Sequence, residues 1–364
     1  MKKKDLLKKF REILVELSKE DNPNFNIELP PQVIEVLLFN YVDDHYEIDE
    51  KVLMALSSLQ MDLTGVRFDN VEVKNIDFFG TIGVEINPQQ VYGKDLSSGM
   101  FSDVTFTGPF DGVKINGADF TGSVNAIIDP QEIDEKDLSF VTLTDVEFIG
   151  SFEDTKIFGA DFTGSANAII DPQEIDEKDL SYTILSDVKF IGDFFETNIE
   201  EADFTGSIGA NIVVDEILGK NLSNAKLTDA KVSGDFFEAQ INGTDFKGIL
   251  NEVTINPQEV YEKDLSYGRF SNVTFDGPFD DVCIVGTNFI NSKNAVIDVS
   301  KIYDKNLLDT NLCDTRLYGS FDGVNIERTN FAGSIGAKID LNTVVGDTSK
   351  TVLIDAMVLK KKHK

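Results

Sequence analysis

Large apolar residues recur about every five positions along most of the chain, with occasional steps of four. An amphipathic helix would place them three or four positions apart, and a half-buried strand would alternate them. The pattern therefore predicts a coil that turns after each short extended piece and directs one bulky side chain inward per side. One block shows it in full, with expected inward positions at Leu138, Leu143, Phe148, Phe152, Ile157, Phe162, Ala166, Ile170 and Ile175.

The same pattern returns in blocks of nearly constant length. Successive blocks start 42 residues apart, with one step of 43, at Leu96, Leu138, Leu180, Leu222, Leu265 and Leu307. A shorter copy opens at Leu63. Repeats of this size form solenoids, in which each unit completes its core only by stacking on its neighbours. We therefore predict an all-β solenoid, a fold that does not by default contain an enzyme pocket.

Phenylalanine fills two equivalent positions of the repeat. The first set is Phe110, Phe152, Phe194, Phe236, Phe279 and Phe321. The second set is Phe120, Phe162, Phe204, Phe246, Phe289 and Phe331. Stacked interior rings gain ~0.5–1.5 kcal/mol per pair beyond their burial. We therefore interpret both sets as core columns and expect no cofactor to stack on them.

One corner of the repeat carries a helix-start pattern. Asp129, Pro130, Gln131 and Glu132 read as an N-cap, a first-turn proline and a capping-box acid. Residues 171–174 and 256–259 repeat this pattern. We therefore expect about two turns of helix at one corner of every second coil.

The two ends of the chain differ from the repeats. Residues 1–62 predict a helical module: a first helix with an apolar face from Leu6 to Leu17, a second over 33–42, and a third capped by Asp49. This module would seal the open end of a β-helix over 63–345, because an open end leaves unpaired backbone groups. The alternative is a partner-binding domain. Residues 346–364 predict a closing strand and a basic tail.

Several five-residue segments carry a resemblance to a known family. Residues 118–122, 160–164 and 202–206 read A-D-F-T-G, and residues 222–230 read L-S-N-A-K-L-T-D-A. They resemble the pentapeptide-repeat family. The resemblance implies a right-handed, quadrilateral parallel β-helix with about 20 residues per coil, so that one 42-residue block makes two coils. A three-sided coil is the geometric alternative. Short helical inserts and the N-terminal α-helical cap are departures from the family pattern.

The resemblance also carries expectations about partners. In this family the C-terminal end often forms a dimer, which makes Val352, Ile354, Met357 and Leu359 candidate homodimer contacts. Some members that confer quinolone resistance bind DNA gyrase by imitating duplex DNA. Those members are shorter and lack the helical module and the inserts.

The net charge of −31 is concentrated in the repeats. Such acidity keeps a solenoid soluble and discourages end-to-end stacking. It also fits a surface that imitates the phosphates of DNA and binds a basic protein, whereas direct nucleic-acid binding is not expected for a chain of this charge. Cys283 and Cys313 lack metal-site spacing and predict a reduced, cytoplasmic protein. Charges interrupt every apolar run near the N-terminus, so we expect no membrane span.

Candidate catalytic chemistry is sparse. His45 and His363 both lie outside the repeats, which rules out a histidine-dependent triad there, and we interpret His45 as a surface residue in a polar turn. Asp276, Asp280 and Asp281 surround Gly277 but match no calcium motif, so turn stabilisation is the favoured role. We expect no catalytic residue, no metal and no cofactor.

Two aromatic residues are expected on the outer surface. Phe195 and Phe237 directly follow inward phenylalanines in neighbouring blocks. Exposed rings in register indicate a contact patch, unless the helical inserts fold over them. The sequence therefore predicts a non-catalytic, acidic protein-binding or scaffold module. The alternatives are a DNA mimic directed at gyrase, topoisomerase or another nucleic-acid-binding protein, and an enzyme acting in a surface groove.

Overall fold

The chain is a β-solenoid of about 14 turns, which confirms the fold class. The structure is a computed structural model that describes residues 3–19 and 28–359. It divides into two compact units. The first comprises Met1–Ile170 with Glu174–Glu177, and the second comprises Asp171–Gln173 with Lys178–Lys364.

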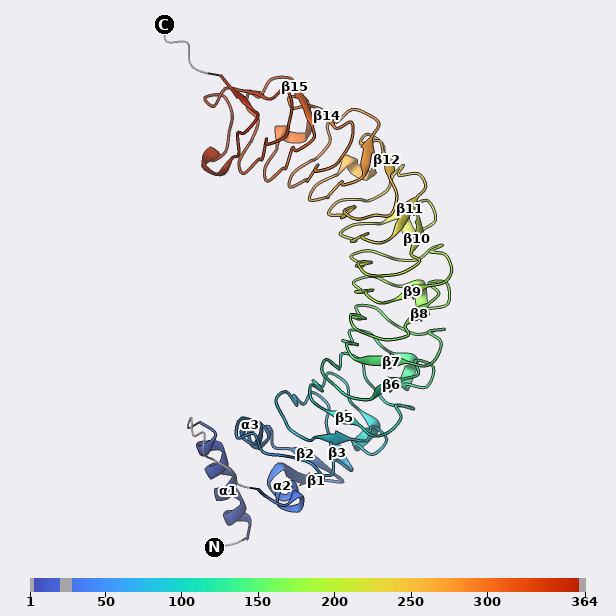
Figure 1. The fold of residues 1–364 in the computed structure, drawn as a ribbon, viewed down its shortest axis with the longest axis vertical. Helices are drawn as coiled ribbons and strands as arrows, with labels where there is room; N and C mark the ends of the chain where they lie inside the picture. The colour runs from blue at the N-terminus through green and yellow to red at the C-terminus, as the bar shows by residue number, and fades with distance from the viewer. Residues whose placement is uncertain (1–2, 20–27, 360–364) are drawn as a thin grey trace. The chain divides into compact units, whose positions relative to one another are not determined.

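The first unit opens with three helices and a small sheet (Figure 1). The helices are α1 (Lys3–Leu17), α2 (Pro31–Leu38) and α3 (Glu50–Ser58). Strands β1 (Phe39–Val42) and β2 (His45–Ile48) form an antiparallel hairpin. Strand β2 then pairs in parallel with β3 (Val71–Glu72) of the first coil. The helical module is therefore joined to the solenoid by backbone hydrogen bonds.

The second helix is shorter than the sequence predicted. It ends at Leu38, and Phe39–Val42 form a strand instead of a last helical turn. Aromatic and β-branched residues favour a pleated strand over a helix, and Asp43 takes the left-handed conformation with φ of 52°, which closes the hairpin turn. The third helix starts as expected, since the Asp49 side chain accepts a hydrogen bond from the Val52 N–H at 3.4 Å.

Short parallel strands form one side of each coil. In the first unit they are β4 (Glu85–Ile86), β5 (Thr105–Phe106), β6 (Ala126–Ile128), β7 (Val146–Phe148) and β8 (Ile169–Ile170). In the second unit they are β9 (Lys189–Phe190), β10 (Asn211–Val213), β11 (Lys231–Ser233), β12 (Val253–Ile255), β13 (Val273–Phe275), β14 (Val296–Asp298), β15 (Arg316–Tyr318), β16 (Lys338–Ile339) and β17 (Met357–Val358). Strands pair in parallel as β4–β5, β6–β7, β10–β11, β12–β13, β14–β15 and β16–β17.

The register shows that one block makes two unequal coils. Thr142 bridges Asp161, 19 residues later, and it also bridges Asp119, 23 residues earlier. The two steps add to the 42-residue block. In the block from Leu138 each coil buries four large inward side chains; those of its first coil are Leu138, Leu143, Phe148 and Phe152. One expected inward position is wrong, because Ala166 is exposed and Ala168 is buried in its place.

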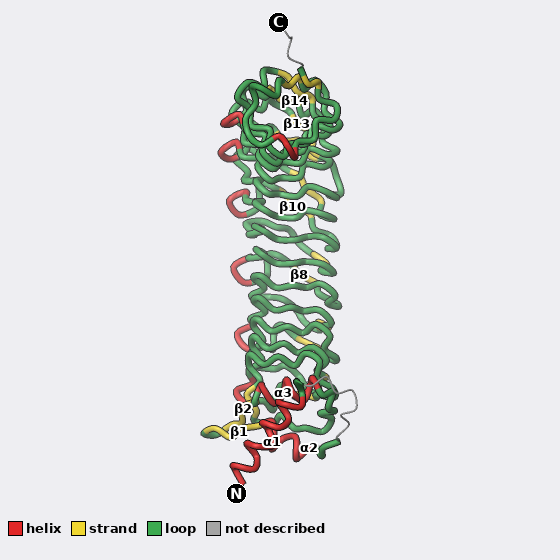
Figure 2. The backbone as a smooth tube through the Cα atoms, turned by 90° about the vertical axis from the view of Figure 1, so that its left-hand side faces the viewer, coloured by secondary structure: helices red, strands yellow, loops and turns green. Residues whose placement is uncertain are grey.

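The corner inserts are shorter than predicted. They are 3-10 segments of three residues: η1 (Tyr92–Lys94), η2 (Asp134–Lys136), η3 (Asp176–Lys178), η4 (Leu218–Lys220), η5 (Tyr261–Lys263), η6 (Tyr303–Lys305) and η7 (Thr348–Lys350). Within each unit the inserts η1 to η6 repeat on one side of the solenoid, whereas η7 near the C-terminal end lies at another corner (Figure 2). Asp129 accepts a hydrogen bond from the Gln131 N–H at 3.0 Å, which closes a turn two residues long. Glu135 and Lys136 then adopt positive φ, which prevents a second helical turn.

All twelve phenylalanines of the two predicted columns are at most 4% exposed. The Phe162 ring lies 5.8 Å from the rings of Phe148 and Phe152, in tilted arrangements. Phe204, in the second unit, lies 5.8 Å from Phe190 in a tilted arrangement and 5.7 Å from Phe194 in an edge-to-face arrangement. These are favourable geometries for aromatic pairs, so the rings form the core of each coil.

Candidate functional site

An apolar groove of about 1150 Å³ lies in the first unit, between the helical module and the first coil. Its lining residues come from α1, α2, β1, β2, β3 and the segment that precedes β3: Leu6, Leu7, Phe10, Gln32, Val33, Glu35, Val36, Leu37, Phe39, Tyr41, Tyr46, Arg67, Asp69 and Val71. Apolar side chains predominate in this lining. The groove is therefore suited to apolar ligands or segments.

Arg11 fixes α1 along one wall of the groove. Its guanidinium donates hydrogen bonds to the carbonyl oxygens of Val36 at 3.2 Å and Phe39 at 3.0 Å. It also donates to Asn40 Oδ1 at 2.6 Å. Because the last carbonyls of a helix lack partners within it, Arg11 satisfies the end of α2 while holding α1 in place.

Several groove side chains remain exposed. Leu6, Val36 and Tyr41 are 54%, 53% and 66% exposed. We predicted that the helical module seals the first coil, with the apolar face of the first helix as part of it. In the structure only Leu14 of that face is buried, and Phe10 is among the residues of the face that remain accessible to solvent. A cluster of accessible apolar side chains on one face is typical of a contact surface.

The rim of the groove is polar and ordered. The Glu35 carboxylate accepts a hydrogen bond from the Arg67 N–H at 3.0 Å. The Arg67 side chain binds Asp69, with Nε at 2.9 Å from Oδ2. Hydrogen bonding to Asp69 raises the pKa of Arg67, so the guanidinium stays charged. These contacts join α2 to the first coil and fix the width of the groove.

The predicted surface contacts Phe195 and Phe237 are about half exposed, at 47% and 49%. Residues of the corner segments reach the backbone carbonyls of both, and one also reaches the ring of Phe195. Gln173 Nε2 donates to the Phe195 carbonyl at 2.8 Å, and Lys220 Nζ donates to the Phe237 carbonyl at 3.0 Å. The Lys178 ammonium lies 5.6 Å from the centre of the Phe195 ring. The rings are thus accessible above a layer of polar side chains.

The equivalent position in the other full blocks is acidic. It is occupied by Asp111, Glu153, Asp280 and Asp322. The aromatic pair is therefore a local feature of two blocks, and we rank it below the groove as a contact surface.

The C-terminal candidates for a dimer contact are accessible. Val352, Ile354, Met357 and Leu359 are 39%, 64%, 59% and 47% exposed. Strand β17 pairs with β16, and Thr351 Oγ1 donates to the Ile326 carbonyl at 2.7 Å. The segment thus closes the last coil while leaving apolar side chains outside. The basic tail, including His363, lies outside the described residues.

Much of the acidity has a structural role. Asp161 Oδ1 accepts a hydrogen bond from the Thr163 N–H at 2.9 Å, which closes an Asx turn at a coil corner. The same bond recurs at Asp62, Asp77, Asp95, Asp119, Asp129, Asp137, Asp171, Asp179, Asp193, Asp203, Asp235, Asp245, Asp264, Asp298, Asp340 and Asp347. Hydrogen bonds from Thr64 and Ser349 lower the pKa of Asp62 and Asp347, respectively. The coil corners therefore stabilise the ionised aspartates.

Asparagine performs the same task in other blocks, which yields a prediction. Asn288 and Asn330, at the position equivalent to Asp161, accept from the N–H two residues on at 3.0 Å. We expect Asp161→Asn to leave stability nearly unchanged and Asp161→Ala to cost about 1 kcal/mol, because alanine leaves a turn donor unpaired. Urea unfolding measures both. Equal losses from the two variants would show that charge, and not the turn bond, matters at this corner.

The remaining candidates have structural partners. Asp280 pairs with Lys301 at 3.1 Å, and Asp281 lies in a turn with φ of 58°. Cys283 and Cys313 are free thiols, and burial raises the pKa of both. His45 was predicted to be a surface residue in a polar turn; it begins strand β2 and is partly buried, with a side chain that is 12% exposed and stacked on Tyr92.

No family model matches the chain, and no curated protein matches it. Within residues 3–19 and 28–359, no helix has both the length and the apolar character needed to cross a bilayer.

Proposed function

We propose that this protein is a non-catalytic binding scaffold, a divergent relative of the pentapeptide-repeat proteins that acts in the cytoplasm. Its N-terminal module would receive an apolar segment of a protein partner. The observation that carries this proposal is the groove, whose volume of about 1150 Å³ coincides with accessible apolar side chains on α1, α2 and β1. The solenoid would hold this module on a regular, rigid support.

The shape and lining of the groove favour an amphipathic helix as the bound segment. Helices bind such grooves through apolar residues spaced three or four positions apart. The walls are formed by Phe10 of α1, Val33 and Val36 of α2, and Tyr41 of β1. A partner with basic residues on its other face would also be attracted by the net charge of −31.

DNA mimicry has weaker support. It rests on the acidity of the repeats, and the Asx turns already give many of these aspartates a structural reason. A gyrase supercoiling assay separates the two functions. A binding scaffold of the kind proposed leaves supercoiling unchanged, whereas a mimic inhibits it and loses inhibition when surface acids are neutralised.

The test of the groove is site-specific crosslinking. A photoreactive amino acid at Val36, which is 53% exposed, should capture a protein partner in the native host. The same group at Val124, which is 50% exposed on a coil of the same unit, is the matched control. The peptide crosslinked at position 36 should carry apolar residues at helical spacing.

Two substitutions then check the captured complex. We expect Val36→Glu to weaken binding of that partner at least tenfold, because a carboxylate would be buried in an apolar groove. Val124→Glu should leave binding unchanged. Binding that survives Val36→Glu, or capture of the same protein from both positions, would contradict the proposal.

A further inference from the structure

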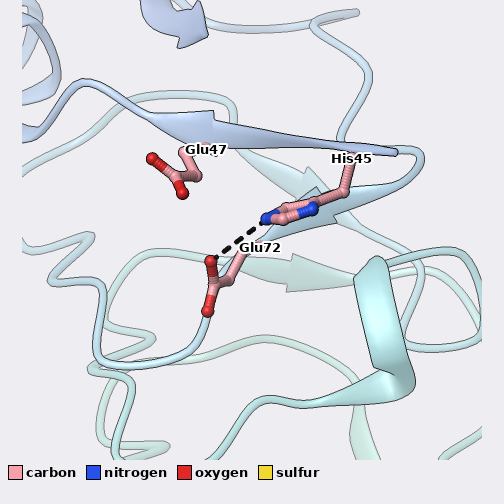
Figure 3. A group of neighbouring side chains, drawn as sticks. All are labelled: His45, Glu47 and Glu72. Atoms are coloured by element: carbon pink, nitrogen blue, oxygen red, sulfur yellow. Dashed lines mark ion pairs between the residues drawn. The ribbon is translucent and has the colours of Figure 1, made fainter. Parts of the chain in front are cut away.

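A second site lies on the outer surface of the small sheet, where β2 meets β3. His45 and Glu47 alternate with Tyr46 on β2 and so project from the same face of the strand. Glu72 on β3 is the register partner of Glu47. Figure 3 shows the imidazole and the two carboxylates directed toward one common point. One ligand atom from each of the three residues lies within 4.8 Å of the others.

The spacing of these atoms fits metal coordination. His45 Nε2 lies 3.4 Å from Glu72 Oε2. A charge-assisted hydrogen bond between such groups is usually shorter, at about 2.7–2.9 Å. Two ligands at about 2.1 Å from a tetrahedral zinc ion lie about 3.4 Å from each other. The separation therefore matches neighbouring ligands of one ion better than a direct ion pair.

The negative charges of the two glutamates also favour binding of a cation. Glu47 and Glu72 are directly opposite on paired strands, an arrangement that destabilises a sheet when both groups are charged. The nearby Lys74 pairs with Asp95 at 3.6 Å. Among residues 3–19 and 28–359, the ion pairs of Lys and Arg do not include either glutamate. A bound cation would convert this repulsion into attraction.

The surroundings of His45 orient it as a ligand. Its Nδ1 lies 3.3 Å from Asp44 Oδ1, and its Nε2 is the nitrogen that faces Glu72. The ring stacks on Tyr92 at 3.9 Å and 13°, which fixes its plane. A carboxylate bound to the far nitrogen is the usual support of a metal-binding histidine.

We propose that His45, Glu47 and Glu72 bind a divalent transition-metal ion of the zinc class, with water completing the coordination. One imidazole and two carboxylates are suitable ligands for Zn²⁺. Since Glu72 belongs to the first coil and the other two ligands to the hairpin, the ion would join the helical module to the solenoid. The site is separate from the groove and does not depend on the proposed partner.

The experiment is metal titration of the full chain after treatment with EDTA. We expect one Zn²⁺ bound per chain by calorimetry, and Co²⁺ in its place to give a visible ligand-field spectrum. His45→Gln and Glu72→Gln should each reduce affinity at least tenfold. Glu85→Gln, which removes an exposed carboxylate from strand β4 of a different sheet, should leave the affinity for Zn²⁺ unchanged.

A second measurement guards against misfolded variants. Glu47 is exposed, so Glu47→Gln should preserve the far-ultraviolet circular dichroism spectrum and still weaken binding. Zn²⁺ should raise the melting temperature of the wild-type chain and have less effect on this variant. The proposal fails if Zn²⁺ does not bind, if binding is indifferent to the three substitutions, or if Ca²⁺ binds in preference to Zn²⁺ and Co²⁺.

Discussion

Phe162→Ala is expected to destabilise the first unit by about 3–5 kcal/mol, the usual cost of removing a buried aromatic ring. Phe162 is fully buried and contacts the rings of Phe148 and Phe152. The cavity cannot close easily, because backbone hydrogen bonds to the coils above and below hold the walls apart. Urea unfolding followed by circular dichroism measures the change.

Ile149→Ala is the matched control for this prediction. Ile149 directly follows strand β7 and is 64% exposed, so its loss should cost less than about 0.5 kcal/mol. A similar loss from both variants would mean that the ring column does not carry the core. Each coil of a solenoid is stabilised mainly by the coils next to it. Phe162→Ala should therefore weaken the coils around it more than distant ones, which would broaden the unfolding transition.

Gly268→Thr is the second substitution with a large expected effect. A Cβ atom at Gly268 would lie 2.6 Å from Cζ of Phe270, a ring that is fully buried and stacked on Phe246. The ring has no space into which it can move. We expect a loss of about 1–3 kcal/mol from overpacking, measured by urea unfolding.

The repeats themselves supply the compensating change. A third equivalent inward position of the repeat is occupied by Phe101, Leu185, Phe270 and Leu312, among others. Where this position is leucine, the residue two places earlier is larger than glycine, as in Thr183 with Leu185 and Thr310 with Leu312. Glycine precedes phenylalanine at Gly268 and also at Gly99, before Phe101. The double variant Gly268→Thr/Phe270→Leu should therefore recover most of the stability lost in Gly268→Thr. If the losses in free energy of unfolding from the two single substitutions simply add in the double variant, the side chains at positions 268 and 270 do not compete for the same space.

Turn chemistry changes the interpretation of the acidic surface. From the sequence alone, the net charge of −31 had two possible explanations, solubility of the solenoid and imitation of DNA. The structure adds a third reason, because many aspartates accept a backbone hydrogen bond at a coil corner, as Asp161 does from Thr163. Substituting several of them by asparagine would remove charge while keeping the turns. Such a variant separates the electrostatic role of these residues from their structural role.

The two-coil block rested on the family resemblance until the bridge steps of 19 and 23 residues excluded a three-sided coil. The sequence alone determined the solenoid and nearly all residues of its core. This was possible because each coil packs on its neighbours through positions that recur in every block, so a local pattern specifies the whole repeat. The column of Phe152, Phe194 and their equivalents is an example: each ring meets nearly the same neighbours. The corner inserts were predicted too long, because an Asx turn and a helix N-cap use the same residues, and only the backbone after Asp129 distinguishes them.

Only the tertiary structure decided what lies at the N-terminal end. The groove depends on Arg11 joining α1 to α2, and the cluster of His45, Glu47 and Glu72 depends on one strand of a hairpin pairing with the first coil. The alternation of aromatic residues through the hairpin was a usable signal for strands, but it does not say which strand they join. These contacts occur once and link residues far apart in the chain, so no repeating pattern records them.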